Sequence, residues 1–254
     1  MDDERALIDS GGYKSFLEHL DDLRKAIVKM VIAVALGILI GFIFTDELVN
    51  LYLYPLSKVN GLGDPKSFLL NLGVADSFNM VLNIAMYGGA VISAPFILYF
   101  LGEFILPALT KKEKKYILPG VGSGIFLFLT GVLFAYFLLL PLTLDFFFSQ
   151  SLKMGFKPSW SMMGYFSFVS NFLLAFGLSF ELPIVVLILN RLGVLPARVL
   201  SKGRRYAFLI IVIIAAAVTP TSDAFTLMAL SLPLYGLYEI CVWIALFRER
   251  KAAN

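Results

Sequence analysis

Residues 26–44 read AIVKMVIAVALGILIGFIF, and Lys29 is the one charged residue in this run. About 20 apolar residues in an α-helix are enough to cross the hydrocarbon core of a bilayer. Five further apolar runs follow, near residues 77–106, 117–140, 165–190, 206–219 and 225–247. The fifth is short, about 21 Å as a helix, so we expect it to cross where the bilayer thins locally. The sequence therefore predicts an all-α polytopic membrane protein with six transmembrane helices, forming a single domain over residues 1–254.

The composition supports a membrane protein. Hydrophobic residues make up 59% of the chain, charged residues make up 15%, and the mean hydropathy is +0.85. Because soluble domains are about a quarter charged, these values exclude a typical soluble enzyme and a disordered chain. One histidine, His19, and one cysteine, Cys241, are too few for a zinc site, and neither an HExxH motif nor a P-loop is present. We expect no metal, no cofactor and no enzymatic activity, and we expect Cys241 to act as a small buried hydrophobe.

Basic residues are distributed unevenly between the predicted loops. If all six runs cross, 17 of the 21 lysines and arginines lie on the side of the amino-terminal segment 1–25, and four lie on the other side (Lys58, Lys66, Lys153 and Lys157). Such an excess marks the cytoplasmic side. We therefore expect both termini and the loops near 107–116 and 191–205 to be cytoplasmic. The amino-terminal segment lacks the basic and apolar regions of a removable signal peptide.

Proline is frequent in and around the predicted spans. Eight of the eleven prolines lie in the spans, at their edges or beside them. Proline kinks a helix, so kinked helices of unequal length are expected to form a curved bundle. Between the spans, Leu48–Leu56 and Phe68–Val74 are predicted as interfacial helices. The aromatic residues within 142–164 are predicted as an interfacial belt.

Glu103 closes the second run, and two further acidic residues lie within the predicted spans. Glu181 lies deep in the fourth run, where an ionised side chain costs about 2.5–3.5 kcal/mol on insertion scales. Such a residue usually faces a cavity or a partner, and the alternative is a protonated carboxyl hydrogen-bonded inside the bundle. Glu239 lies nearer the end of the last run, where it could instead extend to the interface.

Other acidic residues occur on the otherwise basic side. Glu18, Asp21 and Asp22 precede the first run beside Arg24, and Glu113 stands between lysines in the loop after the second run. These carboxylates could simply balance charge. They could equally form a site for a cationic peptide, because guanidinium pairs with carboxylate in a bidentate manner. A peptide with adjacent arginines would then need two carboxylates on neighbouring loops.

Four stretches, in this order, carry a resemblance to a known family: HLDDLRK (19–25), PALTKKEK (107–114), FELP (180–183) and PLYGLYE (233–239). With them the chain resembles TatC, the multispanning receptor of the twin-arginine protein translocase. There are departures from the family pattern. Asp22 stands where glutamate is usual, lysines replace arginines at positions 25 and 114, and the loop TPTSD (219–223) has one additional residue before Asp223.

The resemblance implies a receptor that binds twin-arginine signal peptides at its cytoplasmic face. By position the arginine pair falls to Asp22 and Glu113, and the same face includes Glu18, Asp21, Arg24 and Phe104. Glu181, Pro183 and Glu239 would form an intramembrane polar patch for a partner or the inserting signal, and Pro55 and Asp223 would belong to loop motifs.

The implied partners are folded cargo proteins and single-span proteins of the TatA and TatB type, with membrane lipids around them and self-association possible. No nucleic acid partner is expected. Transport would be driven by the proton-motive force across the cytoplasmic (inner) membrane of a prokaryotic cell. The competing hypothesis is a proton-coupled small-solute carrier that uses Glu181 and Glu239. A membrane enzyme is the weakest alternative, for want of an intramembrane nucleophile–base pair.

Overall fold

The computed structural model describes residues 16–105, 111–191, 193–218 and 224–253. Apart from two short strands, its regular elements there are helical, which confirms the predicted all-α class. The elements, in chain order, are α2 (Phe16–Ile43), α3 (Thr45–Leu53), η1 (Leu56–Lys58), α4 (Pro65–Phe68), β1 (Leu69–Leu70), α5 (Asp76–Ile105), α6 (Lys111–Phe134), η3 (Ala135–Leu139), α7 (Leu140–Lys153), β2 (Trp160–Ser161), α8 (Met162–Ser179), α9 (Leu182–Arg191), α10 (Ala197–Lys202), α11 (Arg204–Val218) and α12 (Ala224–Ala253).

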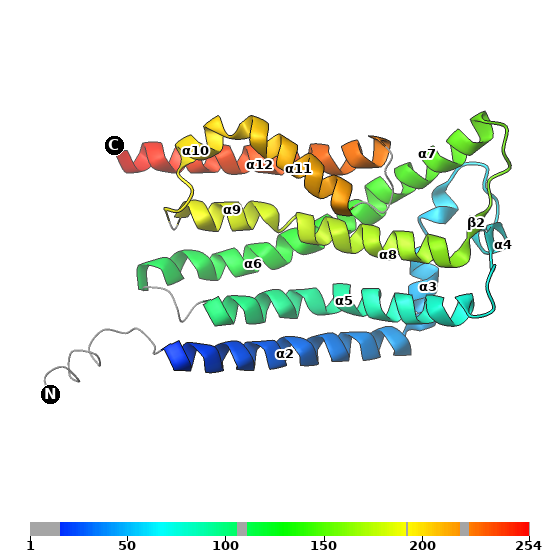
Figure 1. Ribbon diagram of the computed structural model, residues 1–254, viewed down its shortest axis with the longest axis horizontal. Helices are drawn as coiled ribbons and strands as arrows, with labels where there is room; N and C mark the ends of the chain where they lie inside the picture. Colours follow the sequence, from blue (N-terminus) through cyan, green and yellow to red (C-terminus); the bar gives the residue numbers. More distant parts are fainter. Residues whose placement is uncertain (1–15, 106–110, 192, 219–223, 254) are drawn as a thin grey trace, which may run out of the picture.

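The long helices run back and forth along one common direction (Figure 1). The start of α2 and the last turns of α12 lie at the same end, which we call the α2 end; α3, α4 and β2 lie at the opposite end. Five helical segments are long and apolar enough to cross a membrane: Glu18–Ile43, Asp76–Ile105, Pro119–Lys153, Met162–Arg191 and Ala224–Arg250. The chain is thus a multi-pass membrane protein. The fifth predicted span corresponds to α11, whose 15 residues give about 22 Å of helix.

The third helical segment continues well beyond its predicted end at residue 140. After α6 the chain makes one π-helical stretch, η3, and continues as α7 to Lys153. Pro141 lies in the first turn of α7, where the lack of a backbone N–H costs the fewest helical hydrogen bonds. The wider π-helical turn before it accommodates the proline. The aromatic belt predicted for 142–164 is therefore partly wrong, because Phe148 lies on this helix and is buried against Phe68, with ring centroids 5.9 Å apart.

Of the two segments predicted as helices between the spans, one is helical and the other is mostly not. Residues from Leu48 form α3, which ends at Leu53, and Leu56 continues in the short helix η1. From Leu69 onward the Phe68–Val74 segment is not helical, because β1 pairs in parallel with β2, Leu69 opposite Trp160. The partner strand β2 lies about 90 residues away in the sequence. The hydrophobicity of residues 68–74 therefore could not reveal this pairing.

Small residues bring α2 and α5 into close contact. Gly37 and Gly41 are four residues apart on α2 and face Gly89 and Ala85 on α5. A Cβ atom added to Gly89 would lie 2.6 Å from the Cα and N atoms of Ile38, so the backbones themselves are in contact. This spacing is the small-xxx-small pattern by which membrane helices pack without large side chains.

Tyrosine hydroxyls hold α3 against the opposite end of the bundle. Tyr165 donates to the carbonyl of Tyr52 at 2.6 Å, and Tyr136 donates to that of Leu51 at 2.9 Å. Burial raises the pKa of the Tyr52 phenol, whose oxygen accepts a hydrogen bond from Ser170 at 3.3 Å. Pro55, predicted as part of a loop motif, is buried and follows α3 closely. It therefore lies at the opposite end of the molecule from the α2 end.

Candidate functional site

Three segments that carry the predicted peptide-binding residues meet at the α2 end. Asp22 lies in the first turns of α2, Phe104 lies in the last turn of α5, and Glu113 lies in the first turn of α6. Figure 1 shows that these three helix ends lie at one end of the molecule. The side chain of Glu113 lies outside the described residues. The fold therefore places the two predicted carboxylate positions at the same end of the molecule, on α2 and α6, which both pack against α5.

Three side-chain contacts hold α2 against α5 at this end. The imidazole of His19 stacks on the ring of Phe104, with centroids 4.7 Å apart and planes 16° apart. Lys29 Nζ lies 2.8 and 3.0 Å from the two carboxylate oxygens of Glu103. The same ammonium lies 5.6 Å from the ring centroid of Phe100. These aromatic and ionic contacts hold the start of α2 and the end of α5 together, so that the two helix ends form one surface.

Neighbouring aspartates in α2 differ in their surroundings. Asp21 is exposed, and its Oδ2 lies 2.7 Å from Lys25 Nζ; its Oδ1 lies 4.0 Å from Arg24 Nη1. Its charge is therefore balanced within the helix. Asp22 is half-buried, while Glu18 is exposed. Of the residues predicted for this face, acidic Asp21 is thus already paired with Lys25 and, at the longer distance, with Arg24.

Glu181 interrupts the fourth span. The helix breaks at Phe180 and Glu181, between α8 and α9, and Pro183 follows in the first turn of α9. Glu181 Oε1 is buried, and the described residues offer it no hydrogen-bond partner. Gly124 of α6 leaves room for the carboxylate, since a Cβ atom there would lie 3.0 Å from Oε2. A half-buried carboxylate without a partner can accept a hydrogen bond from a polar group that arrives from outside the chain.

Pro183 is buried, and its carbonyl oxygen is used within the chain. The thiol of Cys241 donates to this oxygen, with Sγ and O 3.6 Å apart, and so connects α12 to α9. Cys241 is 2% exposed, which confirms the prediction of a small buried residue.

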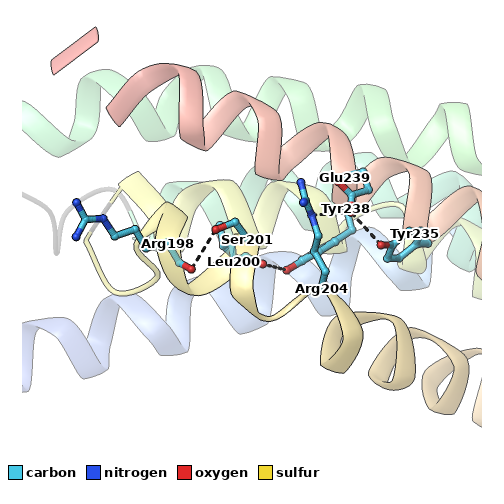
Figure 2. A network of polar contacts seen from close by, with 7 residues as sticks. All are labelled: Arg198, Leu200, Ser201, Arg204, Tyr235, Tyr238 and Glu239. Carbon is cyan, nitrogen blue, oxygen red and sulfur yellow. Dashed lines mark hydrogen bonds and ion pairs between the residues drawn. The ribbon is translucent and has the colours of Figure 1, made fainter. Parts of the chain in front are cut away.

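Glu239 is held by a network between α10, α11 and α12 (Figure 2). Its Oε1 lies 2.9 Å from Arg204 Nε and accepts a hydrogen bond from Tyr235 at 2.9 Å. Tyr238 donates to the carbonyl of Leu200 at 2.8 Å. Among the described residues, no hydrogen bond or ion pair joins Glu239 to Glu181. The network makes Glu239 an anchor between helices and does not favour a carrier that uses the two glutamates together.

Some residues of these sites were not predicted from the sequence. Arg204 and Lys29 make ion pairs with Glu239 and Glu103, but nothing in the sequence near either cation indicates its partner. The glycines at 37 and 41 could have been found from their four-residue spacing. Asp223, predicted for the loop before α12, lies outside the described residues.

Comparison with known proteins supports the resemblance to the TatC family. Two relatives named Sec-independent protein translocase protein TatC illustrate the likeness. That of Carboxydothermus hydrogenoformans is 35% identical over 240 residues, which cover 93% of this chain and 95% of the relative. That of Akkermansia muciniphila is 43% identical over 178 residues, which cover 70% of this chain but only 51% of the relative's length.

Solved structures show the same likeness in three dimensions. A crystal structure of the twin-arginine translocase receptor TatC in DDM superposes with a TM-score of 0.78 at 33% identity, covering 89% of this chain and 99% of that one. A second crystal structure of this receptor gives a TM-score of 0.74 at 32% identity, over 90% of this chain and 98% of that one. The family model for Sec-independent protein translocase protein (TatC) matches residues 18–233. The chain therefore belongs to the TatC family of Sec-independent protein translocase proteins.

Proposed function

We propose that this protein is the receptor subunit of a twin-arginine translocase, which binds the arginine pair of signal peptides at the α2 end. The observation that supports this most is the meeting of the Asp22, Phe104 and Glu113 segments at one end of the bundle. A guanidinium group can pair with each carboxylate, and its flat face can stack on an aromatic ring. The exposed Glu18 adds negative charge to the same end.

The protein would act as a binding and translocation subunit rather than as an enzyme. With single-span partners of the TatA and TatB type, it would move folded proteins across the cytoplasmic membrane by using the proton-motive force. The carboxylate of Glu181, whose buried Oε1 has no hydrogen-bond partner among the described residues, would contact a partner helix or the inserting signal inside the membrane. The carrier hypothesis has no observation of its own in its favour, since Glu239 is ion-paired with Arg204.

The recognition site can be tested by charge reversal. In the Asp22→Lys, Glu113→Lys double variant, we expect crosslinking to a twin-arginine peptide to fall about fivefold, because water-exposed ion pairs contribute only about 0.2–1 kcal/mol each. The measurement is photocrosslinking of a labelled peptide in membrane vesicles. The matched control is Asp46→Lys, Glu47→Lys, which reverses two exposed carboxylates in the first turn of α3, at the opposite end of the bundle. Unchanged crosslinking in the Asp22 and Glu113 variant, with the protein inserted normally, would refute the assignment.

We further propose six spans with both termini in the cytoplasm, so that the α2 end is the cytoplasmic end. The short helix α11 would then cross as the fifth span, with the bilayer thinned around it. Single cysteines at Lys111 and Lys157, in a Cys241→Ala background, should react with an impermeant thiol reagent from opposite sides of the membrane. Labelling of both positions from the outside would contradict this topology.

A further inference from the structure

We propose that a groove between α11 and α12 at the α2 end binds the headgroup of an anionic phospholipid. Five residues line this groove, whose volume is about 220 Å³: Arg204, Trp243, Leu246, Phe247 and Arg250. Arg204 is the first residue of α11, and the others lie on the last turns of α12. The groove is separate from the face proposed for signal peptides, since none of its lining residues belongs to α2, α5 or α6.

The charges of the groove suit a phosphate group. Arg204 uses its Nε for the ion pair with Glu239, which fixes the guanidinium beside α12 (Figure 2). Arg250 is exposed, and within the described part of the chain it makes no ion pair. The groove therefore has two guanidinium groups against one carboxylate. Guanidinium groups are well matched to phosphate oxygens, because their N–H donors form a planar fork.

The apolar surface next to the groove suits a lipid rather than a free anion. On α12, Met228, Leu232, Ile240, Trp243 and Phe247 are exposed and recur at helical spacing, so they form one face that ends at Arg250. Trp243 is 58% exposed, and its ring centroid lies 6.3 Å from that of Phe247. Tryptophan between an apolar face and arginine is typical of the membrane–water interface. Acyl chains would lie along this face, while the phosphate would lie between the two arginines.

The ligand can be identified with the whole purified protein in detergent, by native mass spectrometry. We expect phosphatidylglycerol to be retained in preference to phosphatidylcholine, and inorganic phosphate not to displace it. Arg250→Gln should lower the retention of phosphatidylglycerol about fivefold, which is the effect of one basic residue near anionic lipid. Arg250→Lys should recover most of the retention, because the charge remains.

The matched control is Arg198→Gln on α10. It removes the same charge from the same end of the molecule, but Arg198 points away from Arg204 and does not line the groove (Figure 2). Equal losses in Arg198→Gln and Arg250→Gln would show diffuse attraction by surface charge and would overturn the proposal. Equal retention of the two lipids, or displacement by inorganic phosphate, would overturn it as well. So would an Arg250→Gln variant that retains lipid normally but loses co-purification of a single-span partner, since the groove would then be a protein-binding surface.

Discussion

Gly89→Leu should separate α2 from α5 and lower the thermal midpoint of the purified protein by roughly 6–12 °C, if the cost is about 3 kcal/mol. The reason is geometric. A Cβ atom at this position would lie 2.6 Å from the backbone of Ile38, and a helix backbone cannot rotate away as a side chain can. The whole contact between the two helices must therefore open. The measurement is a thermal unfolding scan in detergent.

The matched control for this variant is Gly122→Leu on α6. Gly122 is also helical, but an added Cβ atom there meets nothing within 4 Å. We expect its midpoint to stay within a few degrees of the parent value, because glycine is already a poor helix former. If Gly89→Leu unfolded at the same temperature as Gly122→Leu, the close contact between α2 and α5 would not be a source of stability.

Glu181→Ala should reduce crosslinking to a single-span partner at least tenfold and reduce transport with it. The buried Oε1 has no hydrogen-bond partner among the described residues, so its hydrogen bond is available to an incoming group. A hydrogen bond to a charged group away from water contributes about 1.5–3 kcal/mol, which is about tenfold or more in binding. Ion pairs at the α2 end are screened by water, so we expect their loss to have the smaller effect.

Glu181→Gln is the matched variant for this experiment. The amide keeps a hydrogen-bonding group of nearly the same shape, so partner contact should be largely retained. Signal-peptide crosslinking at the α2 end should be normal in both variants, because Glu181 lies at the break between α8 and α9 and not at that end. Normal transport and normal partner contact in Glu181→Ala would make the residue merely structural. Loss of peptide crosslinking as well would show that the two sites are not separate.

The sequence by itself determined the membrane class and most of the spans. A helix that crosses a bilayer must satisfy its backbone hydrogen bonds internally and present apolar side chains, so a run such as 26–44 is recognisable without knowledge of its neighbours. The family was also evident from four local motifs, and it is confirmed by the match over residues 18–233. Glu181 stood out for the same local reason, because a carboxylate deep in an apolar run is costly.

Tertiary structure decided the features that depend on distant segments. The helix continues through Pro141 to Lys153 because η3 accommodates the proline, and β1 finds its partner in β2. The pairing of Glu239 with Arg204 exists because α11 packs beside α12. Hydrophobicity and charge along the chain show which residues are costly to bury. They do not show which partner compensates for them, because that is set by how the helices pack in three dimensions.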